Sequence, residues 1–171
     1  MAEAATQQTP TEALIATLDL PQGGWSDAAR KDALSRLQQA GLPERRDEYW
    51  KYTRPDTLTQ PQAVSAAVRA SEDVALFDQI DRLKLVFVDG VFDADASDDL
   101  ALEGITIERL AQADADLHWA RDLYGTLEKN GQTPVARPLA ALNTAFAADG
   151  VLIHVTDKTS KPVNIVYRRT S

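Results

Sequence analysis

The strongest constraint on the fold is a change in hydrophobic period near Leu83. Before this point apolar residues recur at helical spacing, as Leu34 and Leu37 do. From Leu83 the run LKLVFV has the β-branched and aromatic composition of a strand. Asp89 and Gly90 come next, a pair that favours a type I′ hairpin turn. A chain that passes from helices to strands in this way is predicted to be an α+β protein.

The change of period divides the chain into three consecutive segments. Residues 1–82 are predicted to be a mainly helical N-terminal region that contains the motif EYWKYT. Residues 83–148 mix strands with helices. Residues 149–171 open with Asp149 and Gly150, which turn the chain into the apolar stretches VLIHV and VNIVY. Both stretches are predicted to be strands.

Capping residues predict where the first two helices begin and end. Thr9 and Glu12 have the spacing of a capping box, with a proline at the first helical position. Ser26 is the predicted cap of a second helix. Gly41 supplies its stop signal.

Two further helices are predicted in the second half of the chain. The first begins at Asp114 or Asp116, and its apolar side consists of Leu117, Ala120, Tyr124 and Leu127. The second begins at Pro138, and its apolar stripe consists of Leu139, Leu142 and Phe146. Asn143 is predicted to lie on the same stripe. Since an amide on an apolar face must find hydrogen-bond partners, Asn143 is a candidate structural or interface residue.

The stretch from Pro43 to Thr53, PERRDEYWKYT, places three aromatic residues among charges. Arginines beside aromatics are also typical of nucleic-acid surfaces. Here, however, four cations (Arg45, Arg46, Lys51 and Arg54) face Glu44, Asp47 and Glu48, which leaves one net positive charge on a protein of net charge −8. That is too little for counterion-driven binding, so no nucleic-acid partner is expected. Trp50 is either a core residue or part of an interface.

Composition excludes several classes of chemistry. The sequence has no cysteine, which rules out disulfides, thiolate nucleophiles and cysteine-ligated metal centres on this chain. The first residues lack a basic start and an apolar core, and no apolar run approaches the ~20 residues that span a bilayer. We therefore expect a soluble, cytoplasmic protein without a membrane partner.

The remaining candidate sites are an acidic loop and two histidines. The loop Asp93 to Asp99 begins like a calcium loop, but Asp98 replaces the required glycine and Gly104 the bidentate glutamate. His118 and His154 lack a second histidine at ligand spacing. A solvated acidic turn, and histidines that are either satisfied in the structure or at the surface, are therefore favoured over an enzyme that uses a metal at this loop, which stays an alternative.

Four blocks of sequence resemble, in the same order, the SufB/SufD family of scaffold proteins from the SUF iron–sulfur cluster assembly system. After Pro43, the residues Glu48, Trp50, Lys51, Tyr52 and Thr53 match the family signature E-x-W-K-Y-T. The other blocks are LVFVDGVF at 85–92, GITIERL at 104–110 and LAALNTAFAADGVLIHV at 139–155, which includes Asn143, Asp149 and Gly150. The short helical N-terminus before the tryptophan motif is more similar to the SufD branch.

The resemblance implies a fold and a role. The family fold is an N-terminal helical domain, a right-handed parallel β-helix and a C-terminal segment that docks an ABC-type ATPase, SufC. In that scheme a SufD-like protein pairs with a SufB-like paralogue, and the whole complex handles the iron–sulfur cluster. The SufD-like member is not a catalyst, so the resemblance implies no catalytic, metal or cofactor-binding residue on this chain.

The chain is much shorter than members of that family, so residues 149–171 are expected to be only the start of a truncated β-helix. A solenoid needs about three repeats to bury its apolar face, whereas only VLIHV and VNIVY are available here. Their outer edges would be open to pairing. A self-sufficient cytoplasmic module that binds a partner unrelated to cluster assembly is the alternative interpretation.

Removal of the Trp50 side chain tests whether the ring lies in the core. If its ring fills the core, Trp50→Ala should lower the free energy of unfolding by ~3 to 5 kcal/mol, measured by denaturant titration. A change below ~1 kcal/mol would instead indicate a surface or interface position.

Overall fold

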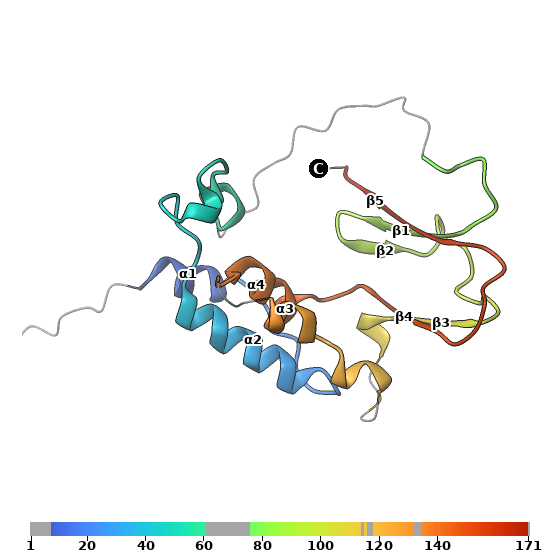
Figure 1. Cartoon of the computed structure of the whole chain (residues 1–171), viewed down its shortest axis with the longest axis horizontal. Coiled ribbons are helices and arrows are strands. Elements are labelled where there is room, and N and C mark those ends of the chain that lie inside the picture. Colours follow the sequence, from blue (N-terminus) through green and yellow to red (C-terminus); the bar gives the residue numbers. More distant parts are fainter. Residues whose placement is uncertain (1–7, 61–75, 114, 116–117, 132–134, 171) are drawn as a thin grey trace, which may run out of the picture. The chain divides into compact units, whose positions relative to one another are not determined.

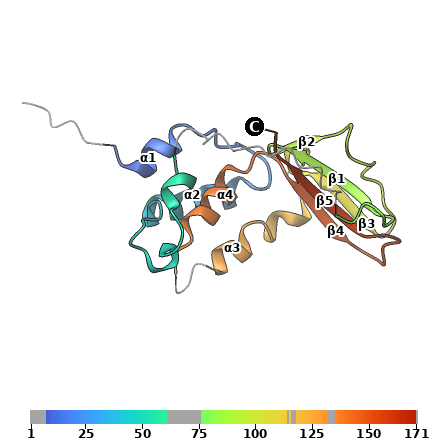
Figure 2. The ribbon, with the colours of Figure 1, turned by 90° about the horizontal axis from the view of Figure 1, so that it is seen from above.

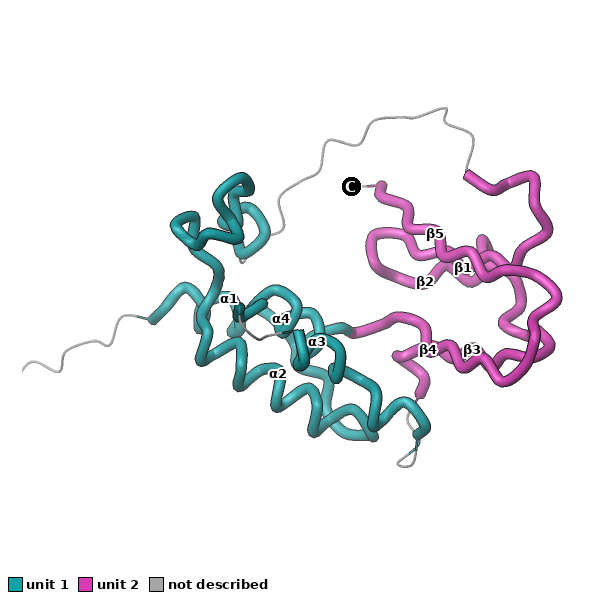
Figure 3. The backbone as a smooth tube through the Cα atoms, viewed as in Figure 1, with its two compact units in different colours: residues 1–64, 114–147 teal, residues 65–113, 148–171 magenta. Residues whose placement is uncertain are grey.

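The computed structural model describes residues 8–60, 76–113, 115, 118–131 and 135–170. They form two compact units, and each unit combines stretches that are not consecutive in sequence (Figure 3). One consists of residues 1–64 with 114–147 and is helical, and the other consists of residues 65–113 with 148–171 and contains the strands. The α+β class is confirmed. The unit boundaries differ from the three consecutive segments because residues 114–147 return to pack with the N-terminal helices.

The helical unit contains α1 (Pro10–Ile15), α2 (Asp27–Ala40), α3 (Thr126–Asn130) and α4 (Pro138–Phe146). The capping box of α1 is confirmed, because the Thr9 hydroxyl accepts the Glu12 N–H at 3.2 Å while the Glu12 carboxylate accepts the Thr9 N–H at 2.7 Å. Gly41 ends α2 as predicted. Helices α2 and α4 lie side by side (Figure 1). Within the described ranges, no helix has the length and apolar composition that crossing a membrane requires.

The long helix predicted to begin at Asp114 or Asp116 is wrong over its described part. Residues 118–131 form a short 3₁₀ helix, η4 (Trp119–Asp122), followed by α3. Gly125 separates them with φ of 75°, a left-handed conformation that an L side chain adopts only at a cost, and a Cβ there would lie 3.0 Å from Thr144 Cγ2. The predicted cap residues and Leu117 lie outside the described residues.

The predicted stripe on α4 is also wrong. The helix begins at Pro138 as expected, but its buried residues are Pro138, Ala141, Thr144 and Ala145. Asn143 is exposed, and therefore needs no buried partner for its amide. The small side chains face inward because α4 packs closely against α2, which itself presents the fully buried Ala33 and Leu37.

A buried arginine joins these helices. Arg30 of α2 is only 4% exposed, and its guanidinium donates from Nη1 to the Ala145 carbonyl and from Nε to the Ser26 hydroxyl, both at 3.0 Å. Ser26 therefore occupies the cap position of α2 without capping it, because its hydroxyl serves Arg30. The Tyr124 hydroxyl donates to the Thr144 carbonyl at 2.8 Å. Two carbonyls in the last turn of α4 are thus satisfied by side chains.

The strand unit contains two small sheets. One has the order β2-β1-β5, in which β1 (Leu83–Val88) pairs antiparallel with β2 (Val91–Asp93) and parallel with β5 (Val163–Arg168). Asp89 and Gly90 join β1 to β2 with φ of 49° and 86°, both positive as a type I′ turn requires, so this hairpin is confirmed. The other sheet pairs β3 (Ile105–Arg109) antiparallel with β4 (Val151–Val155).

The two sheets share one apolar core. Leu83 and Leu85 of β1 are buried together with Ile107 of β3, and Ile153 of β4 and Val163 of β5 pack around them. Figure 2 shows β5 beside β1. The stretches VLIHV and VNIVY are therefore strands, as predicted, but they belong to different sheets. A right-handed parallel β-helix is not seen among the described residues.

Loss of the Arg30 guanidinium should destabilise the helical unit. Arg30→Met keeps an apolar stem but leaves the Ala145 carbonyl and the Ser26 hydroxyl without their donors, which should lower the free energy of unfolding by roughly 2–4 kcal/mol. Lys31→Met is the matched control, since Lys31 is the exposed neighbour and its ion pair with Asp27 is a surface contact that contributes little to stability. Equal losses for the two variants, measured in urea titrations, would contradict the role given to Arg30.

Candidate protein-interaction site

The predicted motif lies in a loop between α2 and a short 3₁₀ helix, η2 (Pro55–Leu58). Pro43 is buried, whereas Glu48, Lys51, Tyr52 and Thr53 are exposed. A further 3₁₀ helix, η1 (Glu48–Trp50), forms the centre of the loop. The structure therefore places most of the motif side chains in solvent and anchors the loop by its first residue.

Short hydrogen bonds fix the path of this loop. The Thr11 hydroxyl of α1 accepts the Leu42 N–H at 3.1 Å. The Asp47 carboxylate accepts the N–H of Glu44, three residues before it, at 2.9 Å. The Asp47 carbonyl then accepts the Trp50 N–H, also at 2.9 Å, at the start of η1. The loop has a defined conformation even though its side chains are exposed.

Aromatic side chains give this loop its chemical character. Tyr49 is 69% exposed and Tyr52 is 92% exposed. The Lys51 ammonium lies 5.5 Å from the centre of the Tyr52 ring. Trp50 is half-buried, and no residue of η1 is buried. Of the two alternatives for Trp50, this burial favours an interface position over a core position, so the smaller of the two outcomes is expected for Trp50→Ala.

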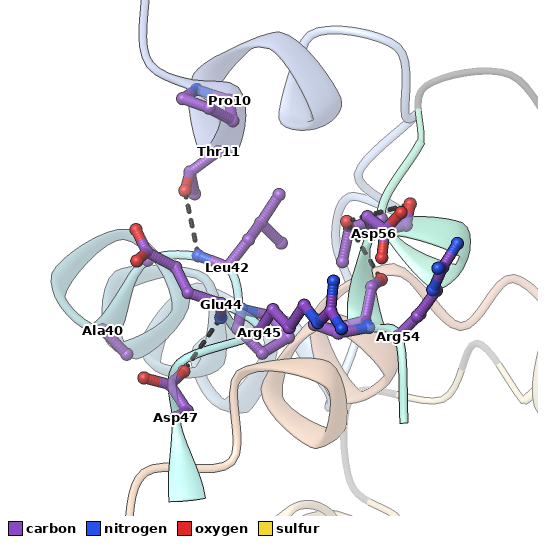
Figure 4. Close-up of a pocket in the computed structure, with 13 residues that line it drawn as sticks. Pro10, Thr11, Ala40, Leu42, Glu44, Arg45, Asp47, Arg54 and Asp56 are labelled. Atoms are coloured by element: carbon purple, nitrogen blue, oxygen red, sulfur yellow. Dashed lines mark hydrogen bonds between the residues drawn. The ribbon is translucent and has the colours of Figure 1, made fainter. Parts of the chain in front are cut away.

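Two grooves flank the loop. The first has a volume of about 670 Å³ and is lined by the start of α1, residues 40–47, and residues 54–59 with η2 (Figure 4). Arg45 and Arg54 both line it. Its size falls in the range of ligand-binding pockets, but five of its thirteen lining residues are charged, whereas small-molecule sites are typically lined by apolar side chains with few polar groups.

The second groove has a volume of about 400 Å³ and is lined by later residues of the same loop. Tyr49 and Trp50 line it together with Pro43, Val135 and Pro138. Both grooves share residues 40–43 and Asp47. No local pattern marked Val135 or Pro138 as site residues, because only the packing of α4 on α2 brings this part of the chain to the loop.

Asp149 and Gly150 lie in the strand unit, at the start of β4. The Asp149 carboxylate forms an ion pair with Arg109 at the end of β3, and accepts the N–H groups of Gly150 at 2.8 Å and Ala111 at 3.4 Å. The Arg109 guanidinium also lies 4.7 Å from the Phe92 ring centre. Burial opposes ionisation of Asp149, but the hydrogen bonds from Arg109 and the backbone outweigh it and lower its pKa. This contact holds β3 to β4.

Side chains of the acidic loop accept hydrogen bonds from backbone N–H groups. Asp98 accepts the Lys84 N–H at 2.6 Å, the Ser97 hydroxyl accepts the Val86 N–H at 2.8 Å, and Asp93 accepts the Ala96 N–H at 3.0 Å. The loop thereby covers the edge of β1 beyond the short strand β2. Among the described residues, no group of three or more His, Asp or Glu side chains is placed to hold a metal ion.

The two histidines have different surroundings. His118 stacks on Trp25, with ring centres 4.8 Å apart, and its Nδ1 accepts the Ala120 N–H at 3.1 Å. It therefore caps η4. His154 lies on β4 with an exposed side chain. The sequence prediction of a structural histidine describes His118 well.

Fold and site together define a class: an α+β protein whose candidate site is an exposed, aromatic and arginine-bearing surface of the kind that contacts other proteins. The sequence model of the SufBD protein N-terminal region matches residues 24–165. The chain belongs to the SufB/SufD family, and it corresponds to the N-terminal part of a SufD-like protein.

A curated relative shows the same similarity. The iron-sulfur cluster assembly protein SufD of Escherichia coli (strain K12) is 33% identical over 134 residues. The aligned region covers 68% of this chain but only 31% of the relative. The chain thus spans about a third of the length of the curated relative that it matches.

Removal of the Asp149 charge should destabilise the strand unit in a pH-dependent way. Asp149→Asn leaves Arg109 without its partner, which should lower the free energy of unfolding by roughly 2–3 kcal/mol near neutral pH. Because the folded-state pKa of Asp149 is lowered, its contribution is present above the pKa of an unfolded aspartate, about 3.9, and is lost as the pH falls through the lower folded value.

Urea titrations of the wild type and Asp149→Asn at neutral and acidic pH measure this difference. The exposed Asp95 lies in the same unit, and Asp95→Asn should have little effect at either pH. A stability difference between wild type and Asp149→Asn that stays constant into the acid range would refute the ion-pair explanation.

Proposed function

We propose that this protein is a SufD-like scaffold component of iron–sulfur cluster assembly that acts through contacts with other proteins rather than by catalysis. The observation that carries the proposal is the family match over residues 24–165. The name of the E. coli relative adds the process, iron–sulfur cluster assembly. The exposed Tyr49 and Tyr52 beside the half-buried Trp50 agree with a role in protein contacts, because aromatics at such positions are typical of binding hot spots.

The proposed partners are a SufB-like paralogue and a SufC-like ABC ATPase, and the proposed location is the cytoplasm. In this proposal the iron–sulfur cluster is cargo of the whole complex, and no residue of this chain is assigned to it. The family motif residues (Pro43, Glu48, Trp50, Lys51, Tyr52, Thr53, Asn143, Asp149 and Gly150) stay predictions as structural or interface positions. The right-handed parallel β-helix after β4 and β5 is likewise a proposal, motivated by the family resemblance.

A self-sufficient partner-binding module is the second candidate function. One observation favours it: each of the two units has its own buried residues, Leu37 and Ala33 in one and Leu83 and Leu85 in the other. A chain with two such cores has the means to fold without further residues.

Association with the proposed partners tests the first function. The complete gene product, co-expressed with tagged SufB-like and SufC-like proteins from the same genome, should co-purify with them in a fixed ratio through affinity and size-exclusion steps. The tagged partners expressed without it are the control for non-specific recovery. A gene product that never associates with either partner, while residues 1–171 melt cooperatively as a monomer, would favour the independent module instead.

A further inference from the structure

Arg45 and Arg54 stand apart from most arginines of this protein. Neither side chain makes an ion pair or a hydrogen bond with the residues that the structure describes, although both line the first groove. Other arginines are engaged: Arg30 by Ala145 and Ser26, Arg36 by Glu128 and Asp32, Arg82 by Asp78, and Arg109 by Asp149. In a chain with 26 acidic and 18 basic residues, counterions are plentiful. Two guanidinium groups that line the same groove without a counterion are therefore available to an external carboxylate.

Three carboxylates also line this groove, but none of them forms an ion pair with Arg45 or Arg54 among the described residues. The Asp47 carboxylate instead accepts the Glu44 N–H. Figure 4 shows the Glu44 carboxylate directed away from Arg45 and Arg54. Asp56 lies on η2 beside Arg54 and forms no ion pair with it among the described residues. The arginine side of the groove thus offers planar, bidentate donors, which recognise carboxylates with defined geometry.

The second groove adjoins the first and presents aromatic and proline side chains. Tyr49 and Trp50 line it, with Pro43 and Pro138 beside them. The two grooves share residues 40–43 and Asp47. An extended chain advances about 3.3 Å per residue, so a segment of a few residues lying across this loop reaches both grooves. Trp, Tyr and Arg are also the residue types that dominate binding energy at protein interfaces.

We infer that the two grooves form one docking site for an extended segment of a partner protein that carries a carboxylate next to an apolar or aromatic side chain. The carboxylate pairs with Arg45 and Arg54, and the apolar side chain packs against Tyr49 and Trp50. This inference rests on the proposed function, since it describes the chemistry by which the scaffold holds a partner. It predicts that the association weakens as salt concentration rises.

Charge-reversal variants of the complete gene product test the inference. Arg45→Glu with Arg54→Glu should weaken binding to the SufB-like or SufC-like protein about 10- to 100-fold, measured as Kd by interferometry. Arg121→Glu with Lys158→Glu makes the same charge change at exposed positions outside both grooves, and should leave Kd within about 2-fold. Thermal melts establish that all variants are folded, and Arg45→Gln with Arg54→Gln should give a smaller loss than the reversal.

A neutralising variant distinguishes the chemistry of the bound segment. Asp56→Asn removes a negative charge beside Arg54, so it should strengthen the binding of an acidic segment by about 2- to 5-fold. If Asp56→Asn weakens binding, the segment is basic and the inference is wrong. The inference is also wrong if the wild type binds and the groove variant (Arg45→Glu with Arg54→Glu) has the same Kd as the control variant (Arg121→Glu with Lys158→Glu). That result leaves the proposed function intact. If the wild type binds neither partner, the proposed function itself fails.

Discussion

The helical unit depends on one buried cation. Among the described residues the Arg30 guanidinium forms no ion pair with a carboxylate, and it is held by the Ala145 carbonyl, the Ser26 hydroxyl and the face of Tyr124, whose ring centre is 5.4 Å away. A short helix such as α4 cannot bury its last carbonyls without donors, and Arg30 and Tyr124 supply two of them. The partial negative charge at a helix C-terminus also favours a cation there.

The candidate site follows from this contact. Arg30 fixes α4 against α2, and the two helices present Pro138 at the start of α4 and Gly41 at the end of α2. These positions meet at the second groove, where Pro138 faces the loop that carries Trp50. The loop with the exposed aromatic side chains is therefore supported by the packed helices α2 and α4, although the loop itself has few buried side chains. A preorganised loop of this kind loses less conformational entropy when it binds a partner.

Local signals made much of the fold predictable, whereas long-range packing did not. The Thr9 capping box, the Asp89–Gly90 turn and the start of α4 at Pro138 each depend on neighbouring residues, and all three are present. The interruption of the predicted helix at Gly125 has no local signal, because a helical pattern tolerates one glycine. It depends on the left-handed backbone of Gly125 and on the nearby Thr144.

The same distinction applies to the strands and to the site. The pairing of β1 with β5 joins Leu83 to Val163, a separation that no local pattern encodes. The stripe on α4 was assigned to the largest side chains, but close helix packing buried Ala141 and Ala145 and left Asn143 in solvent. For the site, the sequence identified the aromatic motif, while the grooves beside it required residues from α1 and α4.

The same physical argument explains why the loop carries exposed aromatic side chains and arginines without counterions. A tyrosine that is 92% exposed contributes almost nothing to the core, and an arginine without a counterion contributes little to stability. Folding alone therefore does not require Tyr52, Arg45 or Arg54 at these positions. Each gains energy only when a partner removes water from the ring or brings a carboxylate to the guanidinium. Their concentration on one loop, in an acidic protein where most of the described arginines are paired, is what binding requires and folding does not.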